Sequence, residues 1–557
     1  MKVLKVDQSA SSGLAIGRAF LFQPLKRQIP DDQVNLEEVP REIERFQIAV
    51  RDALKELEAK ANENAIFAAH VEIVKDITIH EAVIGKIKEE KQNVEKAVWN
   101  VFEDYIMLFD SMEDTYMRER SADLKDIRER LLGVLTGIKN TIILYPADSI
   151  LIAKDLTPSD TASLDLSKIQ GLITRDGGIT SHVAILAKSF SLPALVGVKE
   201  ILKEVKENDY LILDGYTGEV YINPDDSVIH RYEELKKKYQ EENERMKAEE
   251  GLLAITTDGK QIHLCANVGG IEEVKQAVTF QIDGIGLFRS EFLYLGSDHF
   301  PTQEEQFQAY KQALDLCKGE ITIRTLDIGG DKTPPYYKIE KEDNPFLGYR
   351  AIRISLEETE MFKTQLKAIL KASAYGKIRI LLPMIISLEE VIKAKEILAE
   401  CMKEFTNQGI DYDSNIQVGI MIETPASVIC AKELAKEADF FSIGTNDLTQ
   451  YMLAVDRGNA KIAQLYNSFH PAVLRSILHV TEMAHLYGKK VGMCGEFAGN
   501  EKATKLLIGL GLDELSMTCF LIPNIKYQIR RISMESAIDL AKKACSMASI
   551  EEVINLL

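Results

Sequence analysis

The stretch Gly171–Ala187, GLITRDGGITSHVAILA, joins a predicted strand to a predicted helix through a tight turn that its two central glycines permit. Thr180 or Ser181 can cap the helix, which places His182 in its first turn. Free N–H groups and the positive end of the helix dipole would stabilise an anionic group on this imidazole. Because histidine can act as a nucleophile near neutral pH, we hypothesise that His182 is transiently phosphorylated. For this motif alone, an ordinary capping or core histidine is the alternative.

The segments around this motif predict one α/β domain that is interrupted by helices. Residues 141–224 alternate short apolar runs with turn signals, and residues 1–22 carry a further turn and strand that should belong to the same domain. Residues 23–140 are rich in Glu and Lys and have apolar residues at helical spacing, which indicates an inserted helical bundle. Helices are expected across 64–90, 92–112 and 115–138, and strand patterns at Thr141–Leu144 and Ile150–Ala153.

The rest of the chain predicts a linker and a barrel. Residues 225–253, rich in Glu and Lys, are expected to form a solvated helical linker. Residues 254–557 contain eight short apolar runs separated by helical patterns, which favours a parallel (β/α)₈ TIM-like barrel as the last part of a multidomain α/β protein. The eight predicted strands are 262–268, 284–289, 321–328, 379–384, 417–423, 440–445, 490–496 and 514–518.

Polar residues lie in or after several of these predicted strands, and the catalytic groups of a (β/α)₈ barrel collect at the strand ends. Three arginines on one rim suit a small molecule with several negative charges, since guanidinium groups bind phosphate and carboxylate through paired hydrogen bonds. Lys332 could add a fourth positive charge. The polar residues are Arg289, Arg324, Asp327, Glu423, Asn446, Asp447, Arg457, Cys494 and Glu496.

Two carboxylates and one thiol suggest more specific chemistry. Glu423 and Asp447 could hold Mg²⁺, which takes oxygen ligands and often bridges to a substrate phosphate. A salt bridge to arginine is the alternative for either carboxylate alone. Cys494 could transfer a proton at its strand end, or it could fill the core as a small residue, and the residue pattern leaves this choice open.

Composition limits the partners of the chain. Its 557 residues include 67 Lys and Arg and 86 Asp and Glu, and the formal net charge of −19 disfavours nucleic acid and acidic membrane surfaces. No apolar run approaches the ~20 residues of a membrane span, and no signal peptide is recognised. The seven cysteines form no C-x-x-C pair, so we expect neither a zinc site nor disulfides and predict a reduced, cytoplasmic setting.

Several longer motifs occur together and in a fixed order. They are GGITSHVAILA around His182, GIGLFRSEFLY around Arg289, IRTLDIGGDK from Ile323, NPFLGYRAIR from Asn344, IETPAS from Ile422, SIGTNDLTQYMLAVDRGN from Ser442 and GMCGEFAG from Gly492. In these motifs, and in the helical segment 117–132, the chain resembles the bacterial Enzyme I family. Members of this family are the phosphoenolpyruvate–protein phosphotransferases of the sugar phosphotransferase system. The resemblance covers essentially the whole chain.

The resemblance implies a role for each candidate residue. His182 would accept the phosphoryl group, Glu423 and Asp447 would bind Mg²⁺, and Cys494 would protonate the enolate on its way to pyruvate. The inserted helices would bind the carrier protein HPr, the barrel would form a homodimer, and the His182 domain would move between barrel and HPr. The residues that would bind phosphoenolpyruvate are Arg289, Arg324, Lys332, Asn446, Asp447 and Arg457.

Two other functions fit parts of the same pattern. Pyruvate phosphate dikinases and phosphoenolpyruvate synthases resemble the same histidine and barrel parts, but they need a nucleotide-binding domain. This chain has no P-loop pattern and no spare segment of that size. A phosphoenolpyruvate-sensing binding protein is a non-enzymatic alternative, and it would tolerate the loss of His182 or Cys494, both of which are present.

Overall fold

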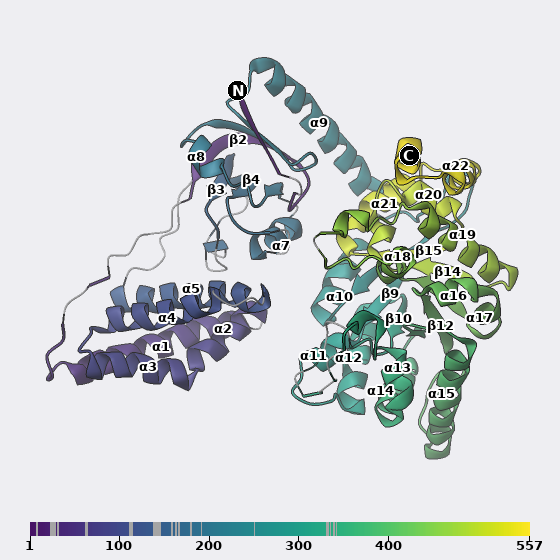
Figure 1. The fold of residues 1–557 in the computed structure, drawn as a ribbon, viewed down its shortest axis with the longest axis horizontal. Helices are drawn as coiled ribbons and strands as arrows, with labels where there is room; N and C mark the ends of the chain where they lie inside the picture. Colours follow the sequence, from purple (N-terminus) through teal and green to yellow (C-terminus); the bar gives the residue numbers. More distant parts are fainter. Residues whose placement is uncertain are drawn as a thin grey trace. The chain divides into compact units, whose positions relative to one another are not determined.

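The computed structural model of the 557-residue chain (Figure 1) divides into two compact units, Met1–Glu241 and Glu242–Leu557, which are described separately. The description leaves out residues 7–8, 23–28, 31–32, 62–64, 111–114, 138–145, 147, 157–159, 162–163, 165–167, 179–180, 191, 250, 330–333, 335, 338–339, 341 and 460. Within helices it also leaves out the side chains of residues 59–61, 65–69, 110, 115–120, 122, 182, 185, 189, 242–243 and 247.

The first unit contains a helical bundle around one apolar core (Figure 1), in which Phe46, Val83 and Phe102 are buried. The predicted helical segment 64–90 contains two helices. Asp76 separates them, because its Oδ1 accepts a hydrogen bond from Thr78 N at 2.7 Å and caps the second helix. The five helices of the bundle are α1 (Val39–Ala61), α2 (Ala65–Lys75), α3 (Ile77–Glu89), α4 (Val94–Asp110) and α5 (Thr115–Thr136).

The strands of this unit form a sheet in the order β1-β7-β6-β2-β3-β4-β5. Strand β2 precedes the bundle in the chain and pairs in parallel with β3, which follows it, so the bundle is an insertion into an α/β domain. Thr141–Leu144 lies outside the described residues, and the predicted strand at Ile150–Ala153 is part of β3. The strands are β1 (Lys2–Lys5), β2 (Leu14–Leu21), β3 (Ser149–Ala153), β4 (Ile169–Thr174), β5 (Ala194–Leu195), β6 (Tyr210–Asp214) and β7 (Glu219–Ile222).

Apolar residues alternate along these strands and supply two cores, one on each face of the sheet. Helix α7 (His182–Ser189) contributes Val183, Ala184 and Ala187 to one core. The short helix α8 (Ile201–Glu204) contributes Ile201 to the other.

One long helix, α9 (Asp226–Glu249), occupies most of the predicted linker, and the boundary between the two units falls within it. Near its start, Tyr232 Oη donates to Asp214 Oδ2 at 3.1 Å, which anchors the helix to the sheet of the first unit. At its end, Glu249 forms ion pairs with Arg530 (3.0 Å) and Arg531 (2.6 Å) of the second unit.

The second unit confirms the predicted barrel. Its eight strands form a closed parallel barrel in the order β10-β11-β12-β13-β14-β15-β8-β9, and helices lie around it (Figure 1). All eight predicted strands are present, although most end earlier than predicted. They are β8 (His263–Val268), β9 (Gly284–Arg289), β10 (Glu320–Arg324), β11 (Ile378–Leu382), β12 (Gln417–Ile422), β13 (Phe440–Ile443), β14 (Lys490–Met493) and β15 (Glu514–Met517).

The largest apolar core lies between the barrel strands and the helices that cover them. Capping boxes at Thr302 and Ser387 fix the starts of two of these helices, α12 and α15. The other helices follow the same pattern of an apolar face towards the strands. The helices of this unit with ten or more residues are α12 (Gln303–Leu316), α14 (Thr359–Ser373), α15 (Leu388–Gln408), α19 (Pro471–Leu486) and α22 (Met534–Ser546).

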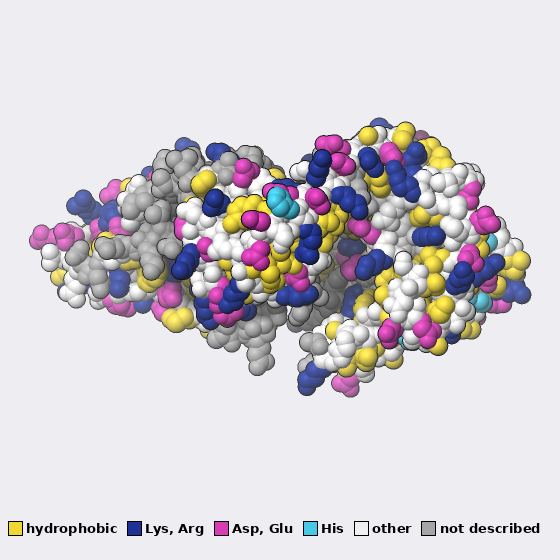
Figure 2. Space-filling model, turned by 90° about the horizontal axis from the view of Figure 1, so that it is seen from above, with side chains coloured by type: hydrophobic (Ala, Val, Ile, Leu, Met, Phe, Trp, Pro, Cys, Tyr) yellow, Lys and Arg dark blue, Asp and Glu magenta, His cyan; other side chains and the backbone are white. Residues whose placement is uncertain are grey.

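One face of the molecule is mixed in charge. On the face that Figure 2 shows, Lys and Arg side chains are interspersed with Asp and Glu side chains among the described residues, and they form no extended basic patch there. In the described parts of the chain, none of the helices combines the length and the apolar character that a membrane crossing requires.

Candidate active site

Six candidate residues lie at or just beyond the ends of barrel strands. Since the strands are parallel, their C-terminal ends meet on one side of the barrel, and the structure brings these residues to one rim. Arg289 ends β9, Arg324 ends β10, Glu423 follows β12 and Cys494 follows β14, while Asn446 and Asp447 begin helix α18 (Thr445–Leu453) after β13.

A chain of buried ion pairs runs along this rim. Arg324 Nη2 donates to Glu291 Oε1 at 3.0 Å, and its Nη1 lies 3.0 Å from Asp327 Oδ2. The other oxygen of Asp327 accepts from Arg350 Nη2 at 2.9 Å, and this nitrogen also donates to Asp447 Oδ2 at 3.4 Å. Burial opposes the charge on Arg324, but the neighbouring carboxylates outweigh it and raise its pKa. The guanidinium groups therefore stay charged inside the barrel mouth.

Arg350 belongs to this rim, although the sequence pattern assigned it no role. It lies in the connection between β10 and α13 (Ile352–Glu357), not at a strand end, so the barrel rule does not select it. Its Nη1 donates to Tyr451 Oη at 3.3 Å, which fixes the guanidinium from a second side. Its place within NPFLGYRAIR, one of the ordered motifs, is the signal that could have identified it.

Glu423 is buried beside the second candidate carboxylate. Its Oε1 accepts a hydrogen bond of 2.6 Å from the backbone N of Met384, which has a φ of 58°. Burial and the nearby charges of Asp447 and Asp327 raise the pKa of Glu423 to about 8. Among the described residues, Asp447 Oδ1 has no hydrogen-bond partner and lies 3.9 Å from Arg457 Nη2. Two carboxylates that repel each other in a buried site are suited to a shared cation.

The raised pKa of Glu423 predicts a pH-dependent stability in a buffer that contains a chelator. The folded protein holds the proton more tightly than the unfolded chain, whose glutamate has a pKa near 4.5. The resulting stabilisation is complete below about pH 4.5 and is lost as the pH rises through about 8. Relative to Glu423→Gln, the parent should lose up to about 1.4 kcal/mol per pH unit in this window, measured by urea unfolding. A difference that stays constant with pH would contradict this prediction.

Cys494 lies between charged and apolar surroundings. Its Sγ is 3.9 Å from the carbonyl oxygen of Ile443, and its side chain is buried. Burial raises the pKa of the thiol to about 11, although a hydrogen bond with Ser442 and the charge of Arg324 lower it in part. The thiol is therefore protonated at neutral pH and can act as a proton donor.

The other predicted substrate ligands differ in their surroundings. Arg289 is exposed and has no ion pair or hydrogen bond to another described residue. Asn446 is paired with Glu496, since its Nδ2 donates to Oε1 at 3.3 Å and its Oδ1 accepts from the Glu496 N at 3.0 Å. Arg457 lies beside Asp447. Lys332 lies outside the described residues.

His182 belongs to the first unit and is the first residue of α7, as predicted. Ser181 is the N-cap, and its Oγ accepts a hydrogen bond from Ala184 N at 3.3 Å. The backbone therefore places His182 at the positive end of the helix dipole. The surroundings of its side chain lie outside the description.

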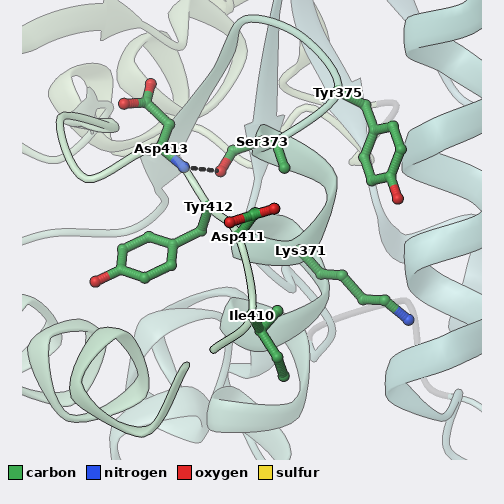
Figure 3. Close-up of a pocket in the computed structure, with 8 residues that line it drawn as sticks. Lys371, Ser373, Tyr375, Ile410, Asp411, Tyr412 and Asp413 are labelled. Carbon is green, nitrogen blue, oxygen red and sulfur yellow. Dashed lines mark hydrogen bonds between the residues drawn. The ribbon is translucent and has the colours of Figure 1, made fainter. Parts of the chain in front are cut away.

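One described cavity lies away from the rim. It has a volume of about 610 Å³ and is lined by Tyr375, Asp411, Tyr412 and neighbouring residues (Figure 3). These residues lie in the connections that precede β11 and β12, and therefore at the end of the barrel opposite the rim. Its Lys371 pairs with Glu304 at 2.6 Å, and none of the candidate residues lines this cavity.

Family models and curated relatives match the chain. The models are the PEP-binding domain of PEP-utilising enzymes (residues 243–534), their N-terminal domain (8–120) and their mobile domain (145–218). Relatives named phosphoenolpyruvate-protein phosphotransferase occur in Buchnera aphidicola (subsp. Acyrthosiphon pisum), Haemophilus influenzae and Geobacillus stearothermophilus. They are 45%, 42% and 43% identical over 98% of this chain and 98%, 97% and 96% of their own lengths, respectively.

The barrel, its charged rim and the matched models define a PEP-utilising enzyme. Since the relatives match over almost their full length, the chain belongs to the phosphoenolpyruvate–protein phosphotransferases, the Enzyme I family. The predicted enzyme class and family are therefore confirmed.

Proposed function

We propose that this chain transfers the phosphoryl group of phosphoenolpyruvate to His182 and then to a histidine of HPr, and that it releases pyruvate. This would be the first step of sugar uptake by the phosphotransferase system. The observation that carries the proposal is the set of unused polar atoms on the rim. Among the described residues, Arg324 Nε, Arg350 Nε and Asp447 Oδ1 are buried without hydrogen-bond partners, as a site for a charged ligand would require.

The residues would share the work as follows. The guanidinium groups of Arg289, Arg324 and Arg350 orient the substrate and stabilise the charge on the transferring phosphoryl group. The bond between phosphorus and the enol oxygen breaks while a bond forms between phosphorus and a ring nitrogen of His182. The Cys494 thiol then gives its proton to C3 of the enolate, which yields pyruvate, and the thiolate recovers a proton from solvent.

Glu423 and Asp447 fit a divalent cation with oxygen ligands, and Mg²⁺ is the proposed ion. The fit rests on Asp447 Oδ1, which accepts no hydrogen bond from a described residue, and on the burial and the neighbouring Asp447 charge that raise the pKa of Glu423 to about 8. No group of three or more His, Cys, Asp or Glu side chains suited to a metal occurs in the described part of the chain. Two protein carboxylates suit Mg²⁺, which keeps waters and binds substrate oxygens. When bound, the ion would neutralise charge on the substrate.

The predicted parts of the chain receive roles in this proposal. Residues 1–22 and 141–224 form the swivelling phosphohistidine domain, and residues 23–140 form the HPr-binding domain. Residues 225–253 are the linker on which His182 moves, and residues 254–557 bind phosphoenolpyruvate and form the homodimer. The enzyme would act in the cytoplasm, where phosphoenolpyruvate and HPr are found.

The test is phosphoryl transfer from phosphoenolpyruvate labelled with ³²P, in the presence of Mg²⁺ and the absence of ATP. We expect one acid-labile label per chain, which moves to HPr when HPr is added. Label that appears only with ATP would favour a dikinase-like or synthase-like enzyme. Binding of phosphoenolpyruvate without any label would favour a sensing protein.

A further inference from the structure

Five apolar side chains form a separate cluster inside the barrel, which we call the barrel floor. All five are buried, and they pack together apart from the main core. The next or preceding residue on each strand, such as Phe288, Ile422 or Met493, belongs to the core outside the barrel. Because side chains alternate along a strand, the five residues of the cluster point into the barrel. They are Leu287, Leu381, Met421, Phe440 and Cys494.

The barrel floor lies between two charged layers. On one side, the guanidinium of Arg379 is 4.4 Å from the ring centre of Phe440 and pairs with Glu514 at 3.0 Å. On the other side is the charged rim. A Cβ at Gly444 would lie 3.1 Å from Met421 Sδ and 3.0 Å from Glu423 Oε2, so the thioether and this carboxylate flank the same backbone position.

The floor also contains the proposed proton donor. Cys494 belongs to the apolar cluster, yet the charges of Arg324, Glu423 and Arg289 act on its thiol. The thiol is thus at the boundary between the rim and the floor. A substrate atom that receives its proton would contact the floor at the same time.

Only one part of phosphoenolpyruvate suits such a surface. Its phosphate and carboxylate are charged, whereas its C3 methylene is apolar and becomes the methyl group of pyruvate. We infer that Leu287, Leu381 and Met421 enclose the C3 carbon and make the enzyme prefer enol phosphates without a substituent at C3. This inference rests on the proposed function, and it adds the residues that determine the accepted substrate class.

Phosphoenolbutyrate, which carries one methyl group on C3, is the probe for this inference. Its reaction is balanced in the same way: the phosphoryl group passes to His182, C3 takes the proton of Cys494, and 2-oxobutyrate leaves. An apolar pocket discriminates one methyl group by about 10–200-fold. We therefore expect the parent to prefer phosphoenolpyruvate over phosphoenolbutyrate by a factor in this range, measured as the ratio of the two kcat/KM values.

Met421→Ala removes a side chain of the barrel floor. It should lower the ratio of the kcat/KM values for phosphoenolpyruvate and phosphoenolbutyrate at least about tenfold. Ile422→Ala is the matched control, because Ile422 follows on the same strand but faces the outer core. It should destabilise the barrel and leave the ratio at the parent value. Met421→Leu, of similar volume, should also keep the parent ratio. Leu287→Val tests the same point if Met421→Ala does not fold.

The outcomes separate this inference from the proposed function. A parent that uses both substrates equally well would overturn the inference, and so would folded Met421→Ala and Leu287→Val variants that keep the parent ratio. A parent that transfers no phosphoryl group from phosphoenolpyruvate would instead contradict the proposed function itself.

Discussion

Replacing His182 with glutamine is expected to abolish phosphoryl transfer to the chain while phosphoenolpyruvate still binds. Glutamine is polar and similar in size, but its amide nitrogen is not a nucleophile, so no phosphorylated intermediate can form. We expect the rate of pyruvate release in the presence of HPr to fall at least about 10⁴-fold, as is typical when an essential nucleophile is removed. Label transfer and equilibrium dialysis with labelled phosphoenolpyruvate measure the two effects separately.

Ser181→Ala is the matched control for this prediction. It removes the side-chain oxygen that caps α7, which accepts from Ala184 N at 3.3 Å, but it leaves the imidazole in place. The loss of an N-cap costs about 1 kcal/mol of stability, so the first unit should unfold at a lower urea concentration. The acid-labile label should nevertheless remain on Ser181→Ala. Label on His182→Gln would place the acceptor elsewhere in the chain.

The strands were the most predictable part of the fold. Each barrel strand is buried on both faces, so it leaves a short apolar run bounded by turn signals, and all eight runs became strands. The strand ends were less predictable. The predicted strand 321–328 stops at Arg324, and the backbone N–H groups of Leu326 and Asp327 donate to side chains instead of a neighbouring strand.

The positions of the candidate residues were predictable where these residues follow the strands and unpredictable where they lie in loops. Arg289, Glu423 and Cys494 were selected by their positions at strand ends. Arg350 was not, since its contacts with Asp327 and Asp447 join distant parts of the chain. A sequence pattern also gives no sign of backbone donors.

The hydrogen bond from Met384 N to Glu423 Oε1 is such a case. It depends on the unusual φ of 58° at Met384. A residue other than glycine in this conformation cannot be recognised from its type. This hydrogen bond joins Met384 to Glu423, about forty positions further along the chain, and so depends on the tertiary fold.

Arg289→Met and Arg324→Met are expected to differ in stability although both lose phosphoryl transfer. Arg289 is exposed and unpaired among the described residues, so its loss should change the stability by less than about 0.5 kcal/mol. Arg324 is buried between Glu291 and Asp327, at 3.0 Å from each. Its loss leaves the buried Glu291 without an arginine partner and Asp327 with Arg350 alone, and removing one partner of a buried ion pair costs about 3–5 kcal/mol.

Both variants should nevertheless lose phosphoryl transfer. Arginines that stabilise a transferring phosphoryl group contribute a factor of about 10³–10⁵ to the rate. The rate of phosphoryl transfer should therefore fall by about 10³–10⁵-fold in each single variant. Urea unfolding of the barrel and the initial rate of label transfer provide the two measurements. If Arg289→Met kept the parent rate, Arg289 would be a surface residue without a role in the reaction. If Arg324→Met kept the parent stability, the ion pairs with Glu291 and Asp327 would not stabilise the rim. The role of Arg324 would then be limited to binding the substrate.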